Sequence, residues 1–75
     1  MIDGVMCTIK KEERGDHIWY WVVYLGELEL EADFIGNSSS SDWARWPKLL
    51  RNTKTRARRH AEKTISELRK VLLLT

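Results

Sequence analysis

The chain has 75 residues, enough for one small domain, and its single cysteine, Cys7, excludes an intrachain disulfide. A domain of this size buries only about 60% of the surface that its unfolded chain exposes, so the four Trp side chains have to supply much of the buried area. No stretch approaches the roughly 20 apolar residues of a membrane span, and a lone thiol fits a reducing compartment, so we expect a cytoplasmic protein.

The net charge of +2 conceals two regions of opposite sign. Residues 1–41 carry three basic and eight acidic side chains, whereas residues 42–63 carry eight basic and two acidic ones. Such asymmetry favours a polyanionic partner. Neutralisation of one region by the other, within the fold or across a dimer, would account for the same totals.

Three stretches have the composition of strands. Residues 4–10 alternate between apolar and polar side chains, and residues 17–25 are aromatic or β-branched at most positions, which is typical of a strand buried on both faces. Residues 27–34 alternate strictly. A two-residue loop at Leu25-Gly26 predicts a register with these side chains on the core face: Trp19, Trp21, Val23, Leu28, Leu30, Ala32 and Phe34.

The opposite face of this predicted sheet combines an apolar ridge with a ladder of acidic side chains. A chain this short has little left to cover that face, so we expect it to meet solvent, a partner protein or a second copy of the chain. The candidate interface residues are Ile18, Tyr20, Val22, Tyr24, Glu27, Glu29 and Glu31.

Residues 36–52 contain a serine-rich linker and predict a flexible loop. Within it, Ser41 or Asp42 can cap a single helical turn that Pro47 then interrupts.

From Thr53 to about Leu72 the apolar residues recur with the spacing of a core-facing helix, and Asn52 or Thr53 is the expected N-cap. The predicted fold is therefore α+β. We expect residues 1–75 to form a single domain, in which a three-stranded antiparallel meander carries one long C-terminal helix packed on one face.

The sequence predicts no catalytic or metal site. Cys7, His17 and His60 match no zinc-ligand spacing, and Cys7 lies on a predicted core face, where a small buried thiol is the common case. The chain has neither a glycine-rich phosphate loop nor a nucleophile elbow. We therefore expect a protein that is not an enzyme and that binds no cofactor or small-molecule substrate.

Basic residues gather where the helix is expected to begin. Acidic side chains are favoured there by about 0.3–1 kcal/mol each, so a basic cluster indicates an anion site, with phosphate as the obvious anion. Lys70 continues a basic strip on the solvent side. Trp43 and Trp46 either stack on bases or pack over the core. The candidate nucleic-acid-binding residues are Arg45, Lys48, Arg51, Lys54, Arg56, Arg58, Arg59 and Lys63, together with Trp43 and Trp46.

Residues 53–63 resemble the start of the last helix of double-stranded-RNA-binding domains, in which a Lys-Lys-x-Ala-Lys pattern touches phosphates. Lys54, Ala57, Arg58 and Ala61 fall on matching positions, and Thr55 departs from the second Lys. The three strands before the helix also resemble the DNA-binding modules at the N-terminus of phage-type integrases, although those read DNA with a sheet face that is acidic here. The order of elements is similar to that of small phage proteins.

These observations lead to two hypotheses. The first is a small, non-enzymatic nucleic-acid-binding accessory protein of phage or prophage origin that contacts DNA or RNA phosphates through the basic half of its helix. The alternative is a protein-binding inhibitor or adaptor of the phage anti-defence type, such as an anti-CRISPR, or a homodimer, which acts through the apolar ridge and the acidic strand.

Overall fold

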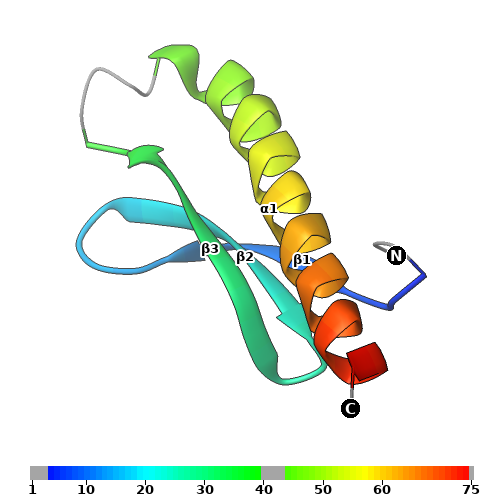
Figure 1. Ribbon diagram of the computed structural model, residues 1–75. Coiled ribbons are helices and arrows are strands. Elements are labelled where there is room, and N and C mark those ends of the chain that lie inside the picture. The colour runs from blue at the N-terminus through cyan, green and yellow to red at the C-terminus, as the bar shows by residue number, and fades with distance from the viewer. Residues whose placement is uncertain (1–3, 40–43, 75) are drawn as a thin grey trace.

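The computed structural model describes residues 4–39 and 44–74, which form an antiparallel sheet and one helix (Figure 1). The strands β1 (Thr8–Glu13), β2 (Ile18–Leu25) and β3 (Leu28–Asn37) lie in the order β1-β2-β3. Helix α1 (Trp46–Leu74) crosses one face of this sheet. The α+β class, the three-stranded meander and the long C-terminal helix are thus confirmed. The predicted cap residues Ser41 and Asp42 lie outside the described residues.

The β2–β3 hairpin closes one residue later than predicted. Leu25 pairs with Leu28 across a Gly26-Glu27 turn, and Tyr24 pairs with Glu29 rather than with Glu27. Gly26 has a φ of 62°, which glycine adopts without steric cost at the first central position of a type II′ turn.

The predicted register is also wrong farther along β3, because the strand contains two irregularities. The pairing shifts between Val23 and Tyr24 and again between Trp19 and Tyr20. Tyr20 therefore pairs with Phe34, and Trp21 pairs with Asp33. Residues that pair directly share a face, so Asp33 lies on the helix side with Trp21 while Phe34 lies on the outer side, the reverse of the expectation.

Helix α1 begins seven residues before the expected start. Trp46 and Pro47 occupy its first turn, where the missing N–H of proline has no helical partner to lose. Asn52 and Thr53 are therefore interior residues and not N-caps, and Thr53 donates its hydroxyl hydrogen back to the carbonyl of Leu49. The loop predicted for residues 36–52 is correspondingly shorter, because β3 reaches Asn37 and α1 covers 46–52.

The core lies between α1 and the helix side of the sheet. Ala57 and Ala61 are fully buried against Val23, and Ile65 is also buried. The small alanine side chains let the helix approach the strands closely. Partly buried apolar side chains complete this layer: Val5, Cys7, Ile9, Trp21 and Leu30.

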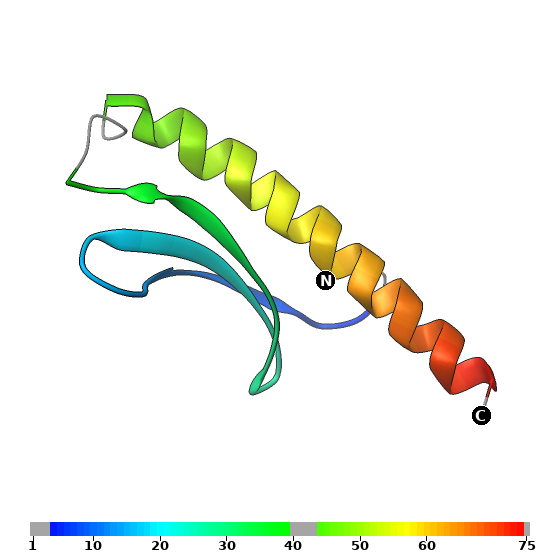
Figure 2. The same cartoon turned by 60° about the vertical axis from the view of Figure 1, so that its left-hand side comes forward.

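The last turns of α1 extend beyond the sheet (Figure 2). Leu68, Val71 and Leu72 were expected to continue the core stripe, but they are 45%, 58% and 72% exposed. The stripe therefore continues on a part of the helix that the strands do not reach. Within residues 4–39 and 44–74, no helix has both the length and the apolar character needed to cross a membrane.

Candidate functional site

Helix α1 is the most strongly charged element of the protein. Its 29 residues include nine Lys or Arg side chains and only Glu62 and Glu67 as acids. Most of these bases fall into two groups. One group makes contacts within the fold, and the other points away from the sheet into solvent.

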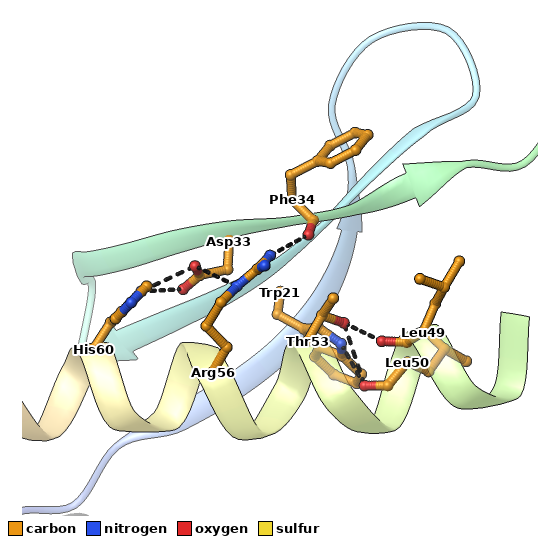
Figure 3. A network of polar contacts seen from close by, with 8 residues as sticks. All are labelled: Trp21, Asp33, Phe34, Leu49, Leu50, Thr53, Arg56 and His60. Atoms are coloured by element: carbon orange, nitrogen blue, oxygen red, sulfur yellow. Dashed lines mark hydrogen bonds and ion pairs between the residues drawn. The ribbon is translucent and has the colours of Figure 1, made fainter. Parts of the chain in front are cut away.

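Arg56 belongs to the first group. Its Nε lies 3.3 Å from Oδ1 of Asp33, and its Nη2 donates a hydrogen bond of 2.8 Å to the carbonyl oxygen of Phe34 (Figure 3). The carboxylate of Asp33 is only 9% exposed, so this guanidinium supplies a partner for a buried charge. Arg56 is therefore a structural link between α1 and β3, and its expected role as a phosphate contact stays a prediction.

His60 completes this network from the next turn of α1. Its Nδ1 lies 3.0 Å from Oδ1 and 3.2 Å from Oδ2 of Asp33 (Figure 3). Beside it, the hydroxyl of Thr64 donates a hydrogen bond to Glu31. Glu31 therefore faces the helix, and its expected place in an exposed acidic ladder is wrong.

Lys54 and Arg58 also have neighbours within the fold. The Nζ of Lys54 lies 5.2 Å from the centroid of the Trp21 ring, in a cation–π arrangement. The Trp21 indole N–H donates a hydrogen bond of 3.0 Å to the carbonyl of Leu50, which fixes the ring against the helix (Figure 3). The Nε of Arg58 lies 3.9 Å from Glu62 one turn later, an exposed pair of small energetic value.

The second group forms what we call the outer strip: Lys48, Arg59, Lys63 and Lys70. Helical geometry places these four side chains within a sector of roughly 60° on the side of α1 opposite Ala57, along about 33 Å of the axis. All four are exposed, and none makes an ion pair with another residue in the described ranges. No acidic residue falls within this sector, because Glu62 and Glu67 lie on either side of it.

The remaining candidates of the basic segment lie beside this strip or away from it. Arg51 is exposed about 60° to one side of the strip, and Arg45 is exposed in the short turn before α1. Trp46 is 8% exposed, so it packs into the fold and is not a stacking platform. Trp43 lies outside the described residues.

The helix dipole does not act on the basic cluster, because α1 starts earlier than the sequence predicted. Residues 54–59 lie eight or more positions inside the helix, whereas the dipole acts within about the first turn. The first turn carries no acidic side chain, and Lys48 is the base within it. The basic residues 54–59 therefore do not form a helix N-terminal anion site, and only Arg59 among them belongs to the outer strip.

The outer sheet face is less open than the sequence indicated. Val22 is fully buried, flanked across the strands by Lys10 and Ala32. Ile18, Tyr20 and Tyr24 are half-buried, and the Phe34 ring, 48% exposed, meets the Tyr20 ring edge-on at 5.7 Å. An aromatic surface thus remains, but it is smaller than the expected ridge.

A polar network lies on the same face. Arg14 contacts Glu29 and also donates a hydrogen bond of 3.4 Å to the Tyr24 hydroxyl, which in turn donates to Glu12. The hydrogen bond to Arg14 lowers the pKa of Glu29, and the hydrogen bond to Glu12 raises the pKa of Tyr24. Glu29 is therefore already paired, while Glu27 lies in the exposed hairpin turn.

Comparisons with protein families, with curated proteins and with solved structures found no match to this chain.

Proposed function

We propose that this protein is a non-enzymatic nucleic-acid-binding module that contacts the phosphate backbone through the outer strip of α1. The observation that carries the proposal is the line of four exposed cations without an acidic residue among them. Its length of about 33 Å is close to one turn of duplex, roughly 34 Å. Arg45 lies at the N-terminal end of this strip.

Within residues 4–39 and 44–74, no acidic side chain forms an ion pair with this strip. Of the acidic residues on β3, Asp33 engages Arg56 and His60, Glu29 engages Arg14, and Glu31 accepts a hydrogen bond from Thr64. These acids of β3 are thus used within the fold, whereas the outer strip is left for an external polyanion. Phosphate contacts of this kind position a protein on nucleic acid without reading its sequence.

Salt dependence gives the direct test. Four phosphate contacts predict a slope of about −3.6 in log K against log salt for duplex DNA, which is a loss of roughly 150-fold between 50 and 200 mM salt. Fluorescence anisotropy with labelled 20-bp DNA, 20-bp RNA and 20-nucleotide single strands would measure affinity and slope together. Absence of binding to all three at 50 mM salt would refute the proposal.

A matched pair of variants distinguishes binding through the outer strip from a general effect of the protein's net charge. Arg59→Gln combined with Lys63→Gln removes two cations from the outer strip and should reduce the magnitude of the duplex slope by about 1.8. Lys10→Gln combined with Lys11→Gln makes the same change in net charge on β1, where these lysines lie over the rings of Tyr24 and Trp19. The slope of this control should match the wild-type slope, and equal losses in both variants would contradict the proposal.

The exposed Phe34 and the adjoining Tyr20 favour a second candidate, a protein partner on the outer sheet face. Phe34→Ser should then abolish the partner's binding and leave binding of nucleic acid unchanged. Pull-down from lysate before and after nuclease treatment distinguishes the two, because partners held through nucleic acid are lost after digestion.

A further inference from the structure

Three potential metal-ligating side chains from two elements meet on the helix side of β3. Glu31 and Asp33 are two residues apart on this strand, and His60 approaches them from α1. One donor atom from each lies within 4.8 Å of the other two. Strict alternation along β3 did not predict this cluster, because the irregular register of the strand is what brings both carboxylates onto the side of His60.

From this geometry we propose that Glu31, Asp33 and His60 form a binding site for a divalent transition-metal ion, with Zn²⁺ as its best fit. Bonds of roughly 2.0–2.2 Å to a tetrahedral Zn²⁺ place neighbouring donor atoms about 3.3 Å apart. The Nδ1 of His60 already lies 3.2 Å from Oδ2 of Asp33. Only the Glu31 carboxylate has to move closer to these two atoms. It accepts a hydrogen bond from the Thr64 hydroxyl, which it can exchange for a bond to the metal.

The charges of the site also favour a cation. Two carboxylates share this space, and Arg56 neutralises one of them from its position beside Oδ1 of Asp33. Oδ2 is left to bind the metal, while Arg56 holds the carboxylate in place as outer partners of metal ligands commonly do. With His60 neutral, as coordination requires, one negative charge remains for the metal to satisfy.

The donor set selects the class of metal. One imidazole nitrogen with two carboxylates suits Zn²⁺ and its transition-metal neighbours, whereas Mg²⁺ and Ca²⁺ require more oxygen ligands and no imidazole. Because the His60 side chain is 51% exposed, water can supply the fourth ligand. A bound ion would join β3 directly to α1, independently of the outer strip.

The proposed site requires coordination by a particular atom, Nδ1 of His60, which can be measured directly. Calorimetric titration of the folded protein with Zn²⁺ should show one site, and Mg²⁺ at the same concentrations should show none. Long-range ¹H–¹⁵N spectra of the imidazoles should show Zn²⁺ on Nδ1 of His60. Glu31→Gln and His60→Gln should each weaken binding at least about tenfold.

Matched controls identify binding elsewhere. Glu27→Gln changes an exposed carboxylate in the hairpin turn, and His17→Gln removes the other histidine, whose Nε2 lies 3.8 Å from Asp16. Both variants should bind Zn²⁺ like the wild type. Circular dichroism confirms that each variant is folded before titration. The proposal is overturned if Zn²⁺ fails to bind below about 1 mM, if His17→Gln abolishes binding, or if the His60 resonances do not respond to Zn²⁺.

Discussion

Arg56 and Arg59 are three residues apart on the same helix, and the structure places them in different surroundings. Arg56 reaches Asp33 and Phe34 on β3, whereas Arg59 points into solvent and makes no ion pair within residues 4–39 and 44–74. Replacing each by Met keeps most of the aliphatic stem and removes the charge. We expect Arg56→Met to cost stability and Arg59→Met to cost binding of nucleic acid.

The magnitude for Arg56→Met follows from its two contacts. Hydrogen bonds that involve a charged group contribute about 1.5–3 kcal/mol each. Because the Arg56 guanidinium is half exposed, solvent weakens both of its contacts, and we take a value near the low end of this range for the two together. We expect a loss of about 2 kcal/mol in the free energy of unfolding, which is a fall of roughly 8–16 °C in Tm for a domain of this size. Arg59→Met should remain within about 0.5 kcal/mol of wild type.

Urea unfolding followed by tryptophan fluorescence measures the first effect, and anisotropy with labelled duplex measures the second. The pair Arg56→Met and Asp33→Asn, taken singly and together, should show a coupling energy of about 1–2 kcal/mol, as expected for side chains in direct contact. The reasoning is refuted if Arg56→Met unfolds at the wild-type urea midpoint. It is equally refuted if both arginine variants, while folded, lose the same affinity for duplex.

Three further outcomes test the packing and the polar network. Ala61 is fully buried where α1 packs closely on the sheet, so the larger side chain of Ala61→Leu would overpack this contact. The substitution should lower the free energy of unfolding by about 1–3 kcal/mol in the same urea assay. Because Arg14 lowers the pKa of Glu29 in the folded state, this pair stabilises the fold above the unfolded pKa of about 4.5. The contribution is lost as the pH falls through the lowered pKa, so Glu29→Gln should flatten the decline of the urea midpoint below that pH. The hydrogen bond to Glu12 raises the pKa of Tyr24, so ultraviolet titration should show a tyrosine that ionises above pH 10 and that Glu12→Gln moves to lower pH.

The elements of this fold follow from local patterns, whereas the details that create its sites do not. Alternation and the density of aromatic residues identify three strands and their antiparallel order, and the spacing of Ala57, Ala61 and Ile65 identifies the core side of the helix. Each of these signals lies within a few consecutive residues. They report which side chains seek burial and therefore predict the fold class.

The irregular pairing of β3 could not be read in the same way. Strict alternation predicted that Asp33 and Glu31 would face solvent, because burial of a carboxylate without partners is costly. The partners of these carboxylates lie more than 20 residues away on α1: Arg56, His60 and Thr64. Whether the carboxylates can be buried therefore depends on contacts that exist only when the helix is packed on the sheet. The start of the helix was missed for a simpler reason, since Pro47 signals a break inside a helix but is tolerated in its first turn.

Because α1 is one continuous helix, the angular positions of its buried residues fix those of its exposed charged residues. An insertion of a single residue after Arg56 would rotate everything beyond it by about 100°, taking Ala61 and Ile65 off the strands and swinging Arg59 and Lys63 toward the sheet. Insertions or deletions in this part of the helix are therefore excluded, while point substitutions along its solvent side remain free. Such substitutions can change the charge of the exposed side of α1 one side chain at a time, without altering the length or the phase of the helix.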